Sequence, residues 1–279
     1  MRRFLSIFKK EIQNYFQTPS VYVMMAIFFV LTGYFYFSTM LYFSELSGAA
    51  YQYMQYGQTP ELNINQMILG NIFGNAAVIM LFVFPMLTMR LFAEEKKSGT
   101  MELLYTYPIK DWEIIIGKFA SALFVVILIL IISFFSILIT DYLYFTSQPE
   151  YTPNIFTYLF KHFPSVVEPG VILSGYLGLI LLASAYISIG MFTSSITENQ
   201  IIAAVLTFGG LLLFYVIGFL GELQGGTLEK FLKEVSFANH FQDFSNGIID
   251  VKNIVYFLIF STFFQFITAR TLESKRWRG

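Results

Sequence analysis

Apolar and polar residues follow one another in long blocks along this chain. Six stretches contain no Asp, Glu, Lys, Arg or His: Val21–Phe43, Met67–Met89, Phe119–Thr140, Val171–Thr193, Ile201–Gly221 and Asn253–Ala269. A helix that crosses the hydrocarbon core of a bilayer needs about 20 mostly apolar residues. Strands of a membrane barrel would be about 10 residues long with alternating polarity, whereas these stretches are apolar on all sides. The pattern predicts six transmembrane helices in an all-α polytopic membrane protein.

The composition agrees with a membrane protein. The 279 residues are 56% hydrophobic, 19% aromatic and 13% charged, against about 25% charged residues in soluble globular domains. The formal net charge is −1, so no basic field favours nucleic acid as a partner. The chain has no Cys, which excludes disulfides, thiolate metal sites and Cys nucleophiles. The gaps between stretches are too short for a soluble domain of about 50 residues, so we expect 1–279 to form a single transmembrane domain.

The distribution of Lys and Arg predicts the orientation in the membrane. Thirteen of the 17 lie in the segments 1–20, 90–118 and 270–279, and the other four lie in 141–170 and 222–252. Because cytoplasmic loops carry the excess of Lys and Arg, both termini and the 90–118 loop are expected in the cytoplasm. The first apolar stretch exceeds the 7–15 residues, roughly, of a cleavable signal peptide, and we interpret it as a retained span.

Residues for catalysis are scarce. No G-x-x-x-x-G-K-[ST] loop is present, so the chain lacks the usual phosphate-binding loop of an ATPase. His162 and His240 lie far apart in outer loops, which favours structural or exposed histidines over a metal site. Ser174 resembles part of an intramembrane serine-protease signature, but Ile172 replaces the required Gly and no span contains His. We therefore expect no catalytic residue, no bound cofactor and no metal in this chain.

Two segments outside the spans are amphipathic. Near the N-terminus, one helical face carries apolar side chains and the others carry Arg3, Lys9 and Lys10. The members of the apolar face are Phe4, Leu5, Phe8, Ile12 and Tyr15. This pattern indicates a helix in the cytoplasmic membrane interface, or simply a basic topology anchor.

In 222–252, an apolar stripe precedes a run in which aromatic and polar residues are mixed. The stripe consists of Leu228, Phe231, Leu232 and Val235. We interpret this outer segment as interfacial or re-entrant, with a turn at Asn246-Gly247.

The 90–118 loop contains a third amphipathic segment. Gly99 interrupts the run, Thr100 can cap a new short helix, and Glu102 then lies in its first turn, where the helix dipole favours an acid. Four side chains with the spacing i, i+3, i+4, i+7 form one exposed apolar stripe. They are Met101, Leu104, Tyr105 and Pro108. Such a helix either lies on the lipid surface or docks in a groove of a soluble partner, and composition alone favours the lipid slightly.

At this point the residues resemble a family. EEKKSGTMELLYTYP at 94–108 is similar to the segment that follows the second helix in type 2 ABC exporter permeases, whose pattern is an acidic residue, Gly-Thr, Glu, a Leu pair and Pro. Lys118, at the foot of the third span, also fits. HFQDFSNGIID at 240–250 and LESKRW at 272–277 resemble a narrower branch, which contains the gliding-motility permease and the permease of nitrous-oxide-reductase copper maturation. The likeness runs along the whole chain.

The resemblance implies a half-transporter in a bacterial or archaeal cytoplasmic (inner) membrane. Two six-helix permease subunits, identical or different, would be driven by separate cytoplasmic ABC ATPase subunits, on which ATP and Mg²⁺ bind. The 94–108 segment would be the coupling helix, which changes our interpretation of its stripe from lipid contact to partner docking. The residues assigned to this contact are Glu94, Glu95, Gly99, Thr100, Met101, Glu102, Leu104, Tyr105 and Pro108. The implied activity is export of a lipidic or amphipathic substrate. The alternative is a complex that acts on envelope machinery without carrying a substrate.

Overall fold

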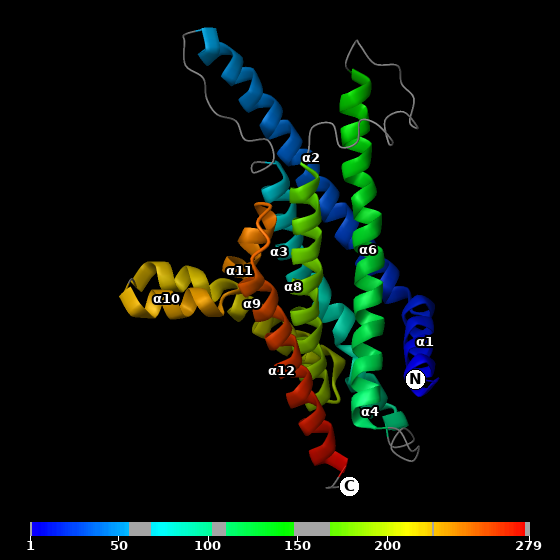
Figure 1. The fold of residues 1–279 in the computed structure, drawn as a ribbon. Coiled ribbons are helices and arrows are strands. Elements are labelled where there is room, and N and C mark those ends of the chain that lie inside the picture. Colours follow the sequence, from blue (N-terminus) through cyan, green and yellow to red (C-terminus); the bar gives the residue numbers. More distant parts are fainter. Residues whose placement is uncertain (1, 56–67, 102–109, 148–167, 225, 277–279) are drawn as a thin grey trace.

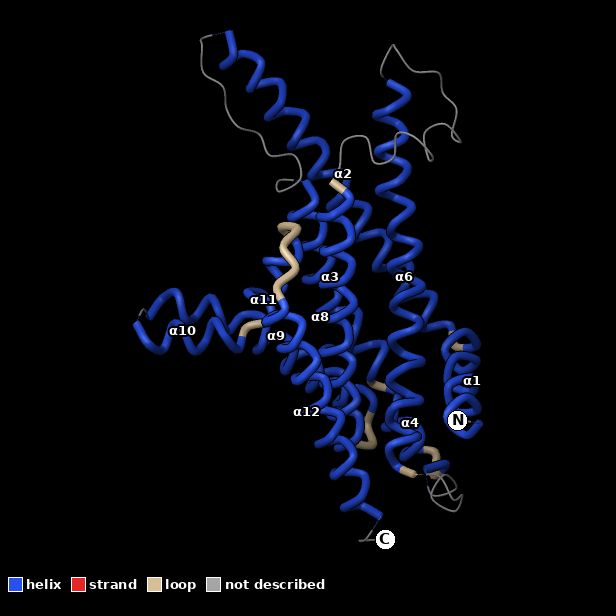
Figure 2. Tube along the Cα trace, viewed as in Figure 1, coloured by secondary structure: helices blue, strands red, loops and turns tan. Residues whose placement is uncertain are grey.

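The computed structural model describes residues 2–55, 68–101, 110–147, 168–224 and 226–276. These residues form helices joined by short turns, with no strand among them (Figure 2). Six helical segments within them are long and apolar enough to cross a membrane: Pro19–Tyr42, Gly70–Lys97, Asp111–Ile139, Pro169–Ile196, Gln200–Gly221 and Val251–Ser274. The predicted all-α fold with six spans is therefore confirmed.

The helices run past the apolar stretches at several ends. The spans belong to α2 (Pro19–Gln55), α3 (Gly70–Thr88) with α4 (Arg90–Lys97), α6 (Asp111–Ser147), α8 (Pro169–Ile196), α9 (Gln200–Gln224) and α12 (Val251–Arg276). With 37 residues each, α2 and α6 are about 55 Å long, well beyond the hydrocarbon thickness of about 30 Å. Both extend past the other helices at the end of the bundle opposite to the chain termini (Figure 1).

The centre of the bundle is formed by α3 and α8. In each of these two spans 72% of the most apolar window is buried inside the chain, against 35% or less in the other four. α8 packs against α3, α6, α9 and α12. Gly190 of α8 lies so close to Thr88 of α3 that a Cβ at Gly190 would overlap the threonine side chain. Glycine at this position therefore permits the close packing of the two central helices.

The segment between the last two spans folds into two short helices. α10 (Gly226–Val235) lies along α9, and α11 (Phe237–Ser245) packs on α8. The chain then turns at Asn246 and Gly247, as the sequence indicates, and Gly247 takes a positive φ of 89°. Of the predicted stripe, Leu232 faces Gly221 of α9, while Phe231 remains 64% exposed.

His240 of α11 is a buried structural residue. Its Nδ1 lies 2.6 Å from Asn253 Oδ1, its Nε2 lies 2.9 Å from the carbonyl oxygen of Glu234, and its ring stacks on Tyr256 with centroids 3.8 Å apart. These contacts join α11 to the end of α10 and to the start of α12. His240 therefore fixes α11 to the bundle. Ser174 is also structural, because its hydroxyl donates to the carbonyl oxygen of Phe244 at 2.7 Å. His162 lies outside the described residues.

The N-terminal helix α1 (Arg2–Gln17) lies beside α6 at the end of the bundle that carries both termini (Figure 1). Its amphipathic character is as expected, but the face that packs into the bundle carries Ile7, Glu11 and Tyr15. Leu5, predicted on the apolar face, is 57% exposed. The helix therefore has one face toward the bundle, which includes a carboxylate, and an apolar edge that remains exposed.

Candidate functional site

The described residues of the 94–108 pattern lie near the place where α1, α4 and α6 meet, at the end of the bundle with both termini (Figure 1). The described members are Glu94, Glu95, Gly99, Thr100 and Met101. The remaining members, Glu102, Leu104, Tyr105 and Pro108, lie outside the described residues.

A buried ion-pair network joins three helices at this place. Nζ of Lys118, on α6, lies 2.9 Å from Oε1 of Glu11 on α1 and 3.0 Å from Oε2 of Glu95 on α4. The Lys118 side chain is only 2% exposed, and its ammonium lies 5.3 Å from the centre of the Phe92 ring. An ion removed from water needs well-placed partners of opposite charge. The two carboxylates supply them, one from each neighbouring helix.

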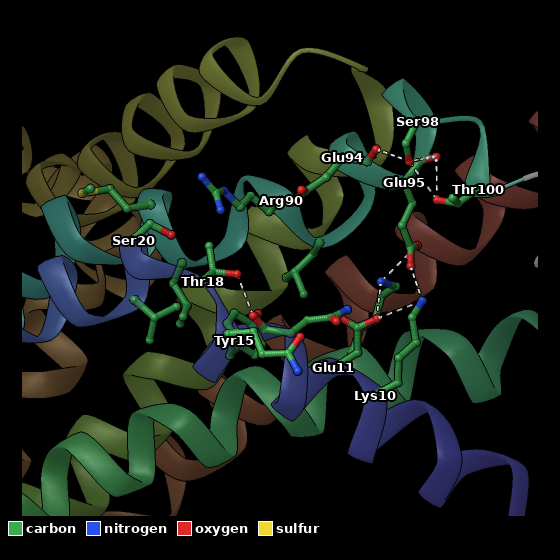
Figure 3. A pocket seen from close by; sticks show the side chains of 17 residues that line it. Lys10, Glu11, Tyr15, Thr18, Ser20, Arg90, Glu94, Glu95, Ser98 and Thr100 are labelled. Carbon is green, nitrogen blue, oxygen red and sulfur yellow. Dashed lines mark hydrogen bonds and ion pairs between the residues drawn. The ribbon is translucent and has the colours of Figure 1, made fainter.

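Lys10 is the exposed member of the network. Its Nζ lies 3.1 Å from Glu95 Oε1 and 3.9 Å from Glu11 Oε1, and its side chain is 53% exposed. Two carboxylates thus face two ammonium groups, so the cluster is balanced in charge. Figure 3 shows Lys10, Glu11 and Glu95 converging from α1 and α4. We name these four residues, Lys10, Glu11, Glu95 and Lys118, the charge network.

The end of α4 is fixed by a compact turn. The N–H of Gly99, whose φ is +71°, donates to the carbonyl oxygen of Lys96 at 3.1 Å. The Ser98 hydroxyl donates to the carbonyl oxygen of Glu94 at 2.9 Å, and the Thr100 hydroxyl donates to that of Glu95 at 3.3 Å. The helix therefore ends at the predicted break, since glycine adopts positive φ without steric cost. The Thr100 hydroxyl is bonded to the preceding helix, so the structure gives Thr100 a role in ending α4.

Met101 departs from the expected exposed stripe. Its side chain is only 4% exposed and belongs to the apolar core of the chain. The i, i+3, i+4, i+7 pattern identifies a shared face but does not say what covers its first residue. The expected exposure of Met101 is therefore wrong, whereas its assignment to the ATPase contact stays a prediction. A docking role for Leu104, Tyr105 and Pro108 stays a prediction.

A second connection, which the sequence did not reveal, ties α4 to α8. Met89 separates α3 from α4 but keeps a helical backbone, with φ −54° and ψ −28°, and its N–H donates to the carbonyl oxygen of Pro85. The Ser194 hydroxyl of α8 accepts from the N–H of Phe92 and of Ala93, each at 3.0 Å, and donates to the carbonyl oxygen of Met89 at 3.0 Å. Ser194 is completely buried. The Ser194 side chain thus binds three backbone groups at the junction of α3 and α4.

These contacts make α4 a rigid arm with a defined attachment at each side. The charge network joins it to α1 and α6, and Ser194 joins it to α8. Lys96 adds a hydrogen bond from its ammonium to the carbonyl oxygen of Ser195. Among the described residues, no group of three or more His, Cys, Asp or Glu side chains is placed to hold a metal ion. The arrangement can therefore transmit displacement between the helices that it joins.

The sequence of the chain matches the family described as ABC-2 family transporter protein over residues 5–272. This chain belongs to the ABC-2 transporter family. It is a multi-pass membrane permease, and permeases of this family pair with separate ATPase subunits. Among curated proteins, none matches this ABC-2 chain. The matched region covers α1 from Leu5 onward, the first five spans, the α4 arm, and α12 as far as Leu272.

Proposed function

We propose that this chain is the membrane-spanning subunit of an ABC exporter, dimerises, and is driven by separate ATPase subunits that dock beyond α4. The observation that carries the proposal is the charge network, because it connects the arm before the 102–109 segment to α1 and α6 at once. A push on that segment would move three helices together. The family assignment supports the ATPase partner in kind, and the exporter activity is our inference.

We further propose that the end of the bundle with α4 and both termini faces the cytoplasm of a bacterial or archaeal cell. Thirteen of 17 Lys and Arg lie in the segments assigned to that side, as expected for cytoplasmic loops. ATP-driven closure of the ATPase pair would then displace α4, and Ser194 would pass the displacement to α8 in the centre of the bundle. Such a shift changes how packed helices meet, and therefore which side the substrate pathway faces.

The substrate that fits best is lipidic or amphipathic. A cavity of about 150 Å³ lies inside the bundle between α2, α3, α6 and α8. Most of its lining is apolar or aromatic, and the aromatic members are Phe28, Phe29, Tyr36, Phe73 and Tyr176. An apolar cavity at membrane depth favours an apolar portion of a ligand. The resemblance to the gliding-motility and nitrous-oxide-reductase-maturation branch is part of the same proposal. Efflux of labelled lipids from vesicles would distinguish export from ATPase activity without transport.

The coupling role is tested by charging the predicted stripe. Leu104→Glu would place a carboxylate against an apolar pocket of the ATPase, at a cost on the order of a few kcal/mol, enough to weaken a roughly micromolar contact beyond detection. Glu102→Ala is expected to have a milder effect, since a first-turn contact with the helix dipole contributes about 0.3–1 kcal/mol. The measurement is co-purification of ATPase activity from membranes that contain equal amounts of each variant.

The matched control is Lys97→Glu, which adds negative charge at an exposed position of α4 outside the stripe and the charge network. Normal ATPase recovery with Lys97→Glu and loss with Leu104→Glu would support docking at the stripe. Full ATPase association and transport with Leu104→Glu, together with loss of lipid contact by the loop, would assign the stripe to the membrane surface and contradict the coupling role.

A further inference from the structure

A polar cavity lies beside the charge network, between the elbow that joins α1 to α2 and the helices α3 and α4. Its volume is about 370 Å³, within the range of small-molecule sites. Figure 3 shows Arg90 and Glu94 on one side and Tyr15 and Thr18 on the other. The elbow is held by its own hydrogen bonds: the Thr18 hydroxyl donates to the carbonyl oxygen of Asn14 at 2.6 Å, and the Tyr22 hydroxyl donates to that of Phe16 at 2.8 Å.

Some charged side chains in the lining, of both signs, form no ion pair within the described part of the chain. Lys10, Glu11, Glu95 and Lys118 neutralise one another in the charge network. Among the described lining residues, this leaves the guanidinium of Arg90 and the carboxylate of Glu94, neither of which has an ion-pair partner in the described part of the chain. Nε of Arg90 is buried and has no hydrogen-bond partner there. One free cation and one free anion thus line the same cavity.

Tyr15 adds a third group without a partner. Its side chain is 9% exposed, and its buried hydroxyl has no hydrogen-bond partner among the described residues. Burial, together with the nearby Glu11 carboxylate, raises the pKa of the Tyr15 phenol well above its ordinary value. The phenol therefore remains protonated and is available as a donor. A buried donor without an acceptor is costly, which favours a ligand that supplies an acceptor oxygen.

The position of the cavity along the bundle indicates the depth of the ligand. Val21, Met86 and Leu87 line its apolar part, and they lie at the ends of the first two apolar stretches. Arg90 and Glu94 follow within two turns of α4, and α1 lies alongside with the amphipathic pattern of an interfacial helix. The cavity therefore lies at the boundary between hydrocarbon and water. Phospholipid headgroups occupy this level of a bilayer.

We propose that this cavity binds the phosphoethanolamine headgroup of a membrane phospholipid. The Arg90 guanidinium and the Tyr15 hydroxyl donate hydrogen bonds to phosphate oxygens, and the headgroup ammonium donates to the Glu94 carboxylate. The apolar lining contacts the glycerol end of the lipid. A free phosphate ion would use the Arg90 side alone and would be repelled by Glu94. The proposal needs the membrane position of the chain and not the ATPase contact proposed above, so each can fail without the other.

The test measures which lipids the full-length chain retains. The purified protein is placed in nanodiscs that contain equal amounts of phosphatidylethanolamine, phosphatidylglycerol and phosphatidylcholine, and bound lipids are counted by native mass spectrometry. We expect phosphatidylethanolamine to be retained preferentially. Arg90→Gln should lower retention about tenfold, since charge-assisted hydrogen bonds are the strong ones. Tyr15→Phe should lower it by a smaller factor.

Glu94→Gln is the decisive variant, because it keeps the size of the side chain and removes only the charge. It should retain a phospholipid but lose the preference for phosphatidylethanolamine over phosphatidylglycerol. Lys97→Gln, a charge change elsewhere on α4, should leave both retention and preference unchanged, and thermal unfolding of each variant shows whether the fold is intact. Soluble O-phosphoethanolamine should compete with the lipid, whereas inorganic phosphate should not.

Two results would overturn the proposal. The first is equal retention of all three lipids by the unchanged chain, or a preference that survives in folded Arg90→Gln and Glu94→Gln. Either finding would show that the cavity does not distinguish lipid headgroups. Displacement of the lipid by inorganic phosphate as effectively as by O-phosphoethanolamine would assign the site to a free phosphate instead.

Discussion

Lys118 is a charged side chain almost fully removed from water, held between carboxylates from two other helices. Burying such a group is costly, and a buried ion pair often adds little to stability compared with an apolar replacement. Its value here is positional, because the ammonium binds its two acceptors only when α1, α4 and α6 stand in one arrangement. Movement of α4 or of α6 alone would leave a charge unpaired, because α4 contributes only Glu95 and α6 contributes only Lys118. The charge network therefore favours concerted movement of the three helices.

Replacing Lys118 tests this role. Lys118→Met leaves Glu11 and Glu95 buried and close to each other with only Lys10 beside them, and loss of one partner of a buried pair costs about 3–5 kcal/mol. We expect a clear fall in the thermal unfolding temperature of the purified chain. The variant that also carries Glu11→Gln and Glu95→Gln should recover most of the loss, because no unpaired charge remains buried.

Lys9→Met is the matched control, since Lys9 is exposed on α1 and outside the charge network. It should unfold as the unchanged chain does. If Lys118→Met unfolds at the same temperature as the Lys9→Met control, the network has no structural role. If the triple variant were no more stable than Lys118→Met alone, unpaired charge would not be the cause.

The sequence identified Glu95 and Lys118 separately but not their meeting with Glu11. Glu11 and Lys118 are 107 positions apart, and no local pattern encodes a contact of that separation. A signal was nevertheless present on α1, where Ile7, Glu11 and Tyr15 recur every four residues and therefore share one helical face. A carboxylate between two residues of a buried face predicts a cationic partner, although it does not say which one.

At the scale of elements, the junction of α3 and α4 at Met89 determines how α4 is held in the bundle. Pro85 lies inside α3, and a proline in a helix removes one backbone hydrogen bond and strains the preceding turn. α3 ends three residues later, and Ser194 of α8 accepts hydrogen bonds from the N–H groups of Phe92 and Ala93 just beyond that end. The arm is thus held by side-chain contacts from α8 as well as by the chain it continues, which allows it to transmit force sideways into the bundle.

Ser194→Ala would remove the side-chain acceptor of the Phe92 and Ala93 N–H groups, at a cost of about 1–3 kcal/mol. We expect these two amides to exchange hydrogen faster, and ATP hydrolysis in the assembled complex to become less tightly linked to transport. Ser194→Thr keeps the hydroxyl and should retain slow exchange. Ser188→Ala, which removes a buried hydroxyl bonded only within α8, is the control. Unchanged exchange at both amides in Ser194→Ala would exclude the proposed attachment.

The six spans were predictable because a continuous apolar run reports directly on burial in lipid. Helix ends were less so, because backbone hydrogen bonds continue past the last apolar residue wherever nothing interrupts them. α2 therefore reaches Gln55 although the apolar stretch ends at Phe43, and α6 starts at Asp111 although the stretch starts at Phe119. The burial of Met101 was not predictable, because amphipathic spacing shows which residues share a helical face but not which part of the protein covers that face.

At the scale of the whole molecule, both termini and α4 share one end of the bundle (Figure 1). We propose that this end faces the cytoplasm, because the segments that lie there carry the excess of Lys and Arg. The chain has no Cys, so single cysteines can report orientation without interference. Ser98→Cys should react with a membrane-impermeant maleimide only in inside-out vesicles, and Phe160→Cys only in intact cells. The reverse pattern would contradict the orientation and the ATPase docking that depends on it.

The central claim is that this ABC-2 chain provides a membrane path and an attachment for an ATPase but no ATP hydrolysis of its own. The most direct measurement is ATP turnover by the chain purified alone, compared with the complex isolated under gentle conditions from the same membranes. We predict no hydrolysis by the isolated chain, and hydrolysis by a complex that contains the permease as a dimer with an ATPase pair. Robust ATP hydrolysis by the demonstrably pure chain would contradict the account.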